Sequence, residues 1–293
     1  MIKWPSELVD SIARRRCVLF LGSGVSANAR TKTGKHPPLW AAFLDQITKE
    51  YSSELSPYLA EIQAMINNGE LLLACEVIVN QLGEHQFGEI AANVFRRPGY
   101  TPAKIHEIIY GLDSRVIITP NIDKIYEQYA LSESRSTVVV KSYTDKDIAK
   151  YLRTDDYLIV RAHGSVDETG KLVFTNSQYG RARIEYATFY RLLDALILTH
   201  TFVFIGCGIN DPDIQLTLEN ANFMYEECPP HFFITAKGSF QPGRESVLCK
   251  NRNLKVLYYD NLSGSHSELL TELEELKRLV DERRETLKSS CTW

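Results

Sequence analysis

The sequence has few cysteines, little net charge and no long hydrophobic run. Its six cysteines are never closer than 21 positions, so it has no CxxC pair of the kind that binds structural zinc. No apolar run approaches the roughly 20 residues of a membrane-spanning helix, and residues 1–5 lack the apolar stretch of a signal peptide. A net charge of −4 does not favour non-specific nucleic-acid binding. We therefore expect a cytoplasmic protein that holds no metal and binds neither membranes nor nucleic acid directly.

Short apolar runs alternate with helical patterns along the chain, which is typical of a parallel α/β sheet. The hydrophobic content of 44% is ample for a large core. Cys17 and Cys207 lie in such apolar runs, so we expect both to be small buried residues. We predict strands at residues 17–21, 116–119, 137–140, 158–161, 202–205, 232–235 and 254–258.

The segment between the first two predicted strands shows only helical patterns. We predict an α/β fold in which a Rossmann-like parallel sheet is flanked by helices, with a helical insert between the first and second strands. The helices of the insert are expected at 39–51, 58–67, 71–81, 89–95 and 103–109. One unit of residues 1–293 would then comprise a core of about 15–38 and 110–262, an insert of about 39–109, and a C-terminal helix of about 266–288.

Residue patterns predict one helix near each end of the sequence. Ser6 is a plausible N-cap for a first helix. The C-terminal helix has an apolar stripe that can pack on its own domain or on a partner. The stripe consists of Leu269, Leu270, Leu273, Leu276 and Val280.

A glycine-rich turn follows the first predicted strand. Glycines at a strand-to-helix turn let the backbone approach a phosphate, and the N–H groups of the helix start favour its charge. An ordinary turn explains the same pattern. The third glycine and the acidic residue of dinucleotide dehydrogenases are absent, so the sequence disfavours hydride transfer. The residues of this turn are Gly22, Ser23, Gly24 and Ser26.

Polar residues follow three further strands. Thr119, Asn121 and Asp123 come after the strand at 116–119, where open α/β sheets bind ligands, although Asp123 can instead cap the next helix. His163 follows the strand at 158–161 and is either a general base or a buried core histidine.

The strand at 202–205 is followed by glycines and then by two carboxylates. Gly206 and Gly208 suit close approach of the backbone to a nucleotide. Asp211 and Asp213 flank Pro212, and Asp followed by Pro is typical of a helix start. The two carboxylates therefore either cap a helix or contact a ligand.

Together and in this order, these motifs resemble those of the sirtuin family, and most closely its bacterial branch of sirtuin-like NAD hydrolases from antiphage defence. The resemblance spans about residues 15–260. The zinc ribbon of protein-deacylating sirtuins is missing, because no cysteine lies between His163 and Cys207, and the loop at 27–39 also departs from the sirtuin pattern. The matching residues are Gly22, Ser23, Gly24, Ser26, Thr119, Asn121, Asp123, His163, Gly164, Gly206, Gly208, Asp211 and Asp213.

The resemblance implies an NAD hydrolase that releases nicotinamide and ADP-ribose, uses NAD as its substrate and needs no metal. It implies catalytic roles for Asn121, His163 and Asp123. Two alternatives remain: a non-catalytic NAD or ADP-ribose sensor or assembly subunit, and a zinc-free deacylase. The implied NAD-binding residues are Gly22, Ser23, Gly24, Ser26, Thr119, Gly206, Gly208 and Asp211.

An NAD hydrolase of this branch would act as a defence effector that depletes NAD on phage infection. Because NAD depletion is toxic, we expect control by assembly. The resemblance implies a homo-oligomer, or a separately encoded partner such as a HerA-type ATPase or a short Argonaute.

Overall fold

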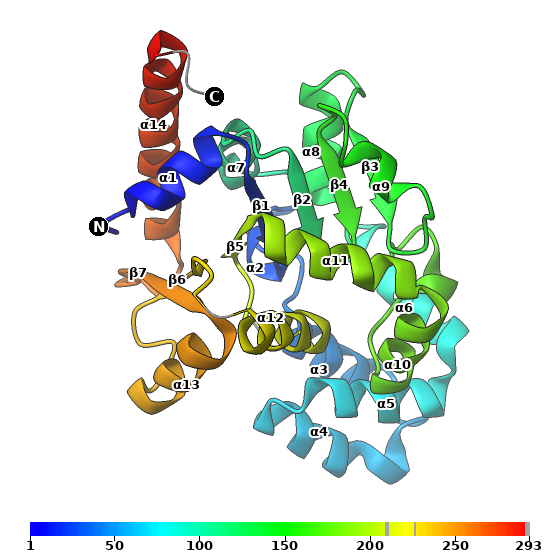
Figure 1. The fold of residues 1–293 in the computed structure, drawn as a ribbon. Coiled ribbons are helices and arrows are strands. Elements are labelled where there is room, and N and C mark those ends of the chain that lie inside the picture. The colour runs from blue at the N-terminus through cyan, green and yellow to red at the C-terminus, as the bar shows by residue number, and fades with distance from the viewer. Residues whose placement is uncertain (209–210, 226, 291–293) are drawn as a thin grey trace.

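One open sheet of seven parallel strands runs through the part of the chain that the computed structural model describes, namely residues 1–208, 211–225 and 227–290 (Figure 1). Its strand order is β3-β4-β2-β1-β5-β6-β7, so the direction of winding reverses between β1 and β5. The predicted α/β, Rossmann-like class is confirmed. The strands are β1 Cys17–Leu21, β2 Val116–Thr119, β3 Val139–Ser142, β4 Leu158–Arg161, β5 Thr201–Ile205, β6 His231–Ala236 and β7 Leu254–Tyr259.

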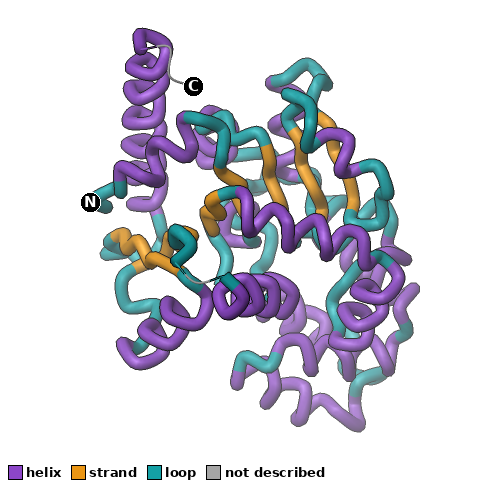
Figure 2. The backbone as a smooth tube through the Cα atoms, viewed as in Figure 1, coloured by secondary structure: helices purple, strands orange, loops and turns teal. Residues whose placement is uncertain are grey.

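Helices cover both faces of the sheet, which explains why its central strands are apolar throughout (Figure 2). Alternate residues of β1 point to opposite faces: Leu19 and Leu21 join one core, and Val18 and Phe20 join the other. The first core includes α1 Ser6–Ala13, α7 Lys104–Gly111, α8 Ile125–Glu133 and α14 Ser267–Ser290. The second includes α10 Asn176–Glu185, α11 Ala187–Thr199 and α12 Pro212–Met224. The short α9 Ile148–Tyr151 follows β3, and α13 Pro242–Arg252 precedes β7.

The apolar stripe of α14 packs on its own chain. Leu273, Leu276 and Val280 are fully buried, and they belong to the same core as Leu8 of α1 and Ile109 of α7. The interpretation that this stripe faces its own domain is therefore confirmed.

The helices at residues 40–95, between β1 and β2, lie over one end of the sheet (Figure 1). Their core also contains Ile122 from the loop after β2, and Val166 and Leu172 from the segment after β4. This packing brings the helical segment against the carboxyl ends of those strands. The elements of this region are α2 Ser23–Ser26, α3 Trp40–Glu50, the 3₁₀ turn η1 Ser56–Tyr58, α4 Leu59–Asn68, α5 Leu71–Leu82 and α6 Glu84–Phe95, and the 3₁₀ turn η2 Thr169–Lys171 follows β4.

Three predicted boundaries were wrong. The strand expected at 137–140 is β3 at 139–142, because Arg135 and Ser136 form a turn with positive φ and pairing with β4 begins only at Val139. The helix expected at 89–95 starts at Glu84, directly after Gly83 (φ 84°) ends α5. Ser6 is the first helical residue and not the N-cap, a position that Pro5 takes without a side-chain hydrogen bond. No helix among the described residues is long and apolar enough to cross a membrane.

Candidate functional site

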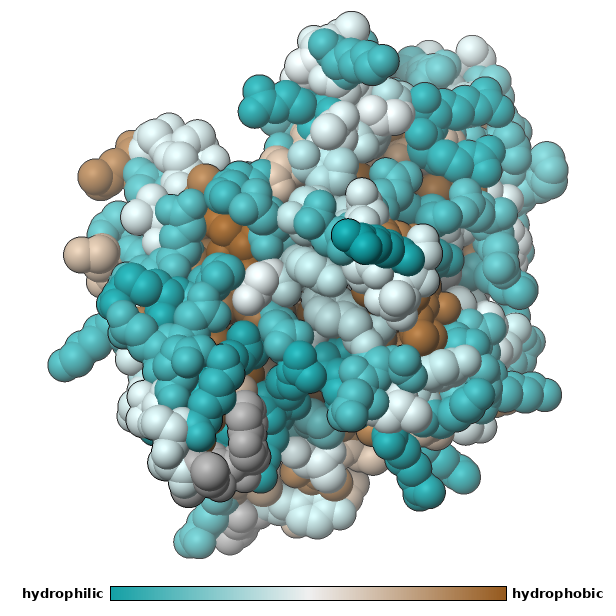
Figure 3. All heavy atoms as spheres, turned by 90° about the horizontal axis from the view of Figure 1, so that it is seen from above, coloured by the Kyte–Doolittle hydropathy of each residue, from teal (hydrophilic) through white to brown (hydrophobic). Residues whose placement is uncertain are grey.

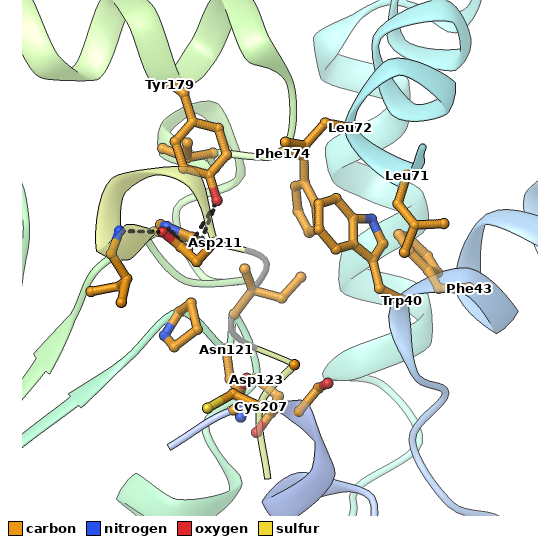
Figure 4. A pocket seen from close by; sticks show the side chains of 18 of the residues that line it. Trp40, Phe43, Leu71, Leu72, Asn121, Asp123, Phe174, Tyr179, Cys207 and Asp211 are labelled. Atoms are coloured by element: carbon orange, nitrogen blue, oxygen red, sulfur yellow. Dashed lines mark hydrogen bonds and ion pairs between the residues drawn. The ribbon is translucent and has the colours of Figure 1, made fainter. Parts of the chain in front are cut away.

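A cavity of about 450 Å³ opens at the carboxyl ends of the central strands (Figure 4). It lies beside the point where the strand order reverses, which is where open α/β sheets bind ligands. Its volume is within the roughly 300–1,000 Å³ typical of ligand pockets. The predicted site residues that line it are Gly22, Ser23, Asn121, Asp123, His163, Gly208 and Asp211.

Asn121 and Asp123 are joined through Ser26. The Asn121 side-chain amide donates to the Ser26 Oγ at 3.1 Å, and the Ser26 hydroxyl donates to Asp123 Oδ1 at 3.0 Å. Ser26 is itself buried on α2, behind the cavity wall. The hydrogen bonds fix the direction in which the Asn121 amide points.

Asp123 also caps the helix that follows it. The N–H of Ile125, the first residue of α8, donates to Asp123 Oδ1 at 3.0 Å. Burial raises the pKa of the Asp123 carboxyl, although hydrogen bonds from Ile125 and Ser26 oppose the shift. Asp123 therefore lines the cavity and also accepts the first N–H of α8, from the position before its N-cap residue Lys124.

The Thr119 side chain forms hydrogen bonds within the protein. Its hydroxyl donates to the Leu21 carbonyl at 2.7 Å and accepts from the Asn121 N–H at 3.1 Å. The side chain thus connects the ends of β1 and β2 and sets the start of the Asn121 turn. It does not line the described part of the cavity.

The glycines after β1 and β5 let two loops touch each other. The Gly22 N–H donates to the Ile205 carbonyl at 2.9 Å, and the Gly24 N–H donates to the Gly206 carbonyl at 2.7 Å. A Cβ at position 22 would lie 2.4 Å from the Cβ of Cys207, and one at position 206 would lie 2.6 Å from the Val25 nitrogen. These N–H groups are thus engaged within the protein, and Gly24 and Gly206 stand behind the cavity wall.

His163, Asp211 and Tyr179 form a hydrogen-bonded group on one side of the cavity. His163 Nε2 lies 3.0 Å from Asp211 Oδ2, and Nδ1 lies 3.4 Å from the Tyr179 hydroxyl. The Tyr179 hydroxyl donates to the same Asp211 oxygen at 3.1 Å. Asp211 also caps α12, because Oδ1 accepts the Ile214 N–H at 3.1 Å. The side chain of Asp213 lies outside the described residues.

The Asp211 carboxyl is held in its charged form. Burial by itself raises its pKa, but the charge that His163 can carry and the hydrogen bonds from His163, Ile214 and Tyr179 outweigh burial and lower the pKa. At neutral pH the group beside His163 is therefore a carboxylate.

An apolar wall faces this group across the cavity (Figure 4). Trp40 and Phe43 come from α3, Leu71 and Leu72 from α5, and Phe174 from the segment after η2. The Trp40 and Phe174 rings are 6.3 Å apart in an edge-on arrangement. The wall excludes water from one side of the site.

The sequence patterns missed this wall and Tyr179. Helical spacing in α3 and α5 indicates only a buried face, and it does not tell a core face from a cavity face. Cys207 was predicted to be buried but is partly exposed and lines the cavity, because β5 ends at Ile205 and the cysteine follows it. The apolar run that continues from β5 hid this boundary.

The described part of the cavity wall carries carboxylates and no Lys or Arg. Its acidic members are Glu70, Asp123 and Asp211. No group of three His, Cys, Asp or Glu side chains suited to a metal ion occurs among the described residues. On this part of the wall, an anionic part of a ligand would therefore be met by uncharged donors, namely backbone N–H groups, hydroxyls and the side-chain N–H groups of residues such as Asn121 and Asn176, or by His163.

Part of the chain is similar to a known family. Residues 115–257 match the family model of the SIR2-like domain. Defense-associated sirtuin 2 of Bacillus subtilis is 23% identical over 270 residues, which cover 91% of this chain and 25% of that protein.

Two similar proteins are each named NAD(+) hydrolase ThsA. The Enterococcus faecium protein is 23% identical over 235 residues, covering 78% of this chain and 45% of the relative. The one from Bacillus cereus (strain MSX-D12) is 22% identical over 239 residues, covering 80% and 46%. The chain thus spans less than half the length of each of these relatives.

Proposed function

We propose that this chain, which carries a SIR2-like domain over residues 115–257, binds NAD in the cavity and hydrolyses its nicotinamide–ribose bond. One observation carries the proposal: Asn121, Asp123 and His163 come from the ends of two different strands and line the same cavity at the point where the winding of the sheet reverses. The names of the relatives, two of them NAD(+) hydrolases, agree with it.

The reaction needs polar groups that position the substrate and the attacking water and that stabilise developing charge. The N-glycosidic bond breaks through an oxocarbenium-like state, and nicotinamide leaves as a neutral molecule, so a strong acid is not needed. His163 takes a proton from the attacking water or from a ribose hydroxyl. Asn121 orients the ribose or the water, with its amide direction set by Ser26. Asp123 supports the positive charge that develops on the sugar.

The opposite wall has a complementary role. Trp40, Phe174 and Leu71 keep bulk water away from the reacting carbon, which strengthens the electrostatic interactions inside. Ser23 and Gly208 line the cavity and are assigned to the diphosphate. Gly22, Gly24 and Gly206 act by holding their loops together, since their close contacts are with one another.

The products of this reaction are nicotinamide and ADP-ribose, and its effect in a cell is loss of NAD. We assign the protein to antiphage defence, in line with the name of its Bacillus subtilis relative, Defense-associated sirtuin 2. Uncontrolled loss of NAD is toxic, so we propose control by assembly. The assembly is a homo-oligomer or a complex with a separately encoded partner, such as a HerA-type ATPase or a short Argonaute.

Incubation of the purified protein with NAD, followed by chromatographic separation, tests the proposal. Equal amounts of nicotinamide and ADP-ribose are expected. Binding of ADP-ribose without release of nicotinamide would instead show a sensor. An acyl-ADP-ribose product formed only with an acylated peptide would show a zinc-free deacylase.

A further inference from the structure

We propose that Asp211 and Tyr179 are positioning residues that set which ring nitrogen of His163 carries the proton, and that Asp211 does not bind NAD. The inference rests on the proposed function for its chemistry, but its geometry is independent of the substrate. Asp211 thus has a different role from the NAD binding that its sequence motif implies.

The arrangement determines which ring nitrogen carries the proton. A carboxylate only accepts hydrogen bonds, so Asp211 Oδ2 at 3.0 Å holds the single proton of neutral His163 on Nε2. Nδ1 then carries the lone pair, so it is the ring nitrogen that can accept a proton. The Tyr179 hydroxyl lies 3.4 Å from Nδ1, longer than an ordinary hydrogen bond, so a water or a ribose hydroxyl can compete for this nitrogen.

Tyr179 can form a hydrogen bond with the His163–Asp211 pair whether His163 is neutral or protonated. With neutral His163, the Tyr179 hydroxyl donates to Asp211 Oδ2 at 3.1 Å. When Nδ1 has taken a proton, that new N–H can donate to the Tyr179 oxygen while the phenolic proton stays directed at Asp211. The imidazolium therefore forms without leaving either ring nitrogen or the carboxylate unpaired.

The proton transfer is balanced within the site. An O–H bond of water breaks, its proton goes to Nδ1, and the oxygen bonds to the anomeric carbon. The bond from that carbon to nicotinamide breaks, and its electron pair leaves with neutral nicotinamide. The charge gained by His163 lies beside the Asp211 carboxylate, where burial strengthens their attraction.

Two ionisable groups face the His163 ring directly, Asp211 just before α12 and Tyr179 from α10. Glu70, Asp123 and Cys207 line the same cavity. Asp211 is the carboxylate in direct contact with the ring, so its charge acts on the histidine at the shortest range.

The test compares kcat and KM for the wild type, Asp211→Asn and Tyr179→Phe. Asparagine is a good N-cap, so Asp211→Asn can keep its oxygen on the Ile214 N–H. Its amide nitrogen then replaces Oδ2, the oxygen that faces His163 and Tyr179. We expect kcat to fall about 10- to 100-fold, within the share of general-base catalysis. Tyr179→Phe should lower kcat less, and KM should stay unchanged in both.

Glu219→Gln is the matched control, since it removes another carboxylate of α12 that pairs with Arg252 outside the cavity. A raised KM with an unchanged kcat would show that Asp211 binds NAD. An equal loss of kcat in Glu219→Gln would show a merely structural role. Either result overturns the proposal.

The ¹⁵N NMR signals of the His163 ring separate this proposal from the proposed function, because they report which ring nitrogen carries the proton and need no turnover. The His163 resonances are assigned from a His163→Gln spectrum. The wild type should carry the proton on Nε2, and Asp211→Asn should move it to Nδ1, since the asparagine N–H₂ donates to Nε2. The same proton position in both proteins would overturn the proposal whatever the activity.

Discussion

Ser26 connects the two polar side chains on which the proposed chemistry depends. It accepts from Asn121 and donates to Asp123, yet it lies behind the cavity wall. Removing it leaves both cavity residues in place but frees the Asn121 amide to rotate. The residue thus acts on the reaction only through its neighbours.

We predict that Ser26→Ala lowers kcat roughly 10-fold, because it removes two hydrogen bonds worth about 0.5–1.5 kcal/mol each. The thermal midpoint should fall only slightly. NAD turnover and a thermal melt measure the two effects, with the exposed Ser53→Ala as the control. Full turnover in Ser26→Ala would show that the Asn121 amide does not need this support.

The polar site residues could be predicted because each follows an apolar strand. Asn121 and His163 have no hydrophobic reason to stand at a strand end, so their residue type is informative. Tyr179 and Trp40 lie on helices, where an aromatic residue is equally typical of a core. Only the path of the chain in space shows that they meet at the cavity.

Strands buried on both faces were the easiest elements to predict. β1 and β2 are fully buried, and their continuous apolar runs coincide with their boundaries. β3 is an edge strand of intermediate burial, and its mixed pattern left the preceding turn undetected. Edge position thus explains the two-residue error.

His231 links β6 to β5 near their amino ends and makes the fold sensitive to acid. Its Nδ1 accepts the Phe202 N–H at 3.1 Å. Burial lowers the pKa of His231 from 6.5 to about 4 in the folded protein. Below pH 6.5 the unfolded chain takes up a proton more readily, so the stabilisation is complete above that pH and is lost as the pH falls toward 4.

Between pH 7.5 and pH 4.5, we predict that the free energy of unfolding falls by about 3 kcal/mol less in His231→Gln than in the wild type. Glutamine can still accept the Phe202 N–H through its side-chain oxygen, but it does not titrate. Urea unfolding at the two pH values measures the difference. His85→Gln, at an exposed position of α6, is the control. Equal losses in the His231 variant and the wild type would contradict the account.

At the scale of the whole molecule, the helix α14 that stabilises the sheet lies away from the cavity. The helix α14 packs on one face of the sheet, whereas the cavity-lining helices α3 and α5 lie over its carboxyl end (Figure 1). The face seen from above is mostly hydrophilic, with hydrophobic residues in small separate areas (Figure 3). The strand order, and with it the meeting of the β1 and β5 loops, could not be derived from local patterns, because it depends on which distant strands pair.

We predict that Leu276→Ala lowers the free energy of unfolding by about 3 kcal/mol, the usual cost of a cavity at a fully buried leucine. KM for NAD should not change, because α14 does not line the cavity. Urea denaturation and steady-state kinetics measure the two values. Leu270→Ala, which is partly buried on the same helix, should cost less. A change of oligomeric state without loss of stability would show that the stripe is an interface instead.

The central claim is that Asn121 directs cleavage of NAD in the cavity at the sheet switch point. The most direct test is a time course of nicotinamide release from NAD by the wild type and by Asn121→Ala, with Ser53→Ala as the control and circular dichroism to verify folding. The account predicts release by the wild type and the control, and a loss of about 100-fold or more in a folded Asn121→Ala protein. Undiminished release by Asn121→Ala would contradict it.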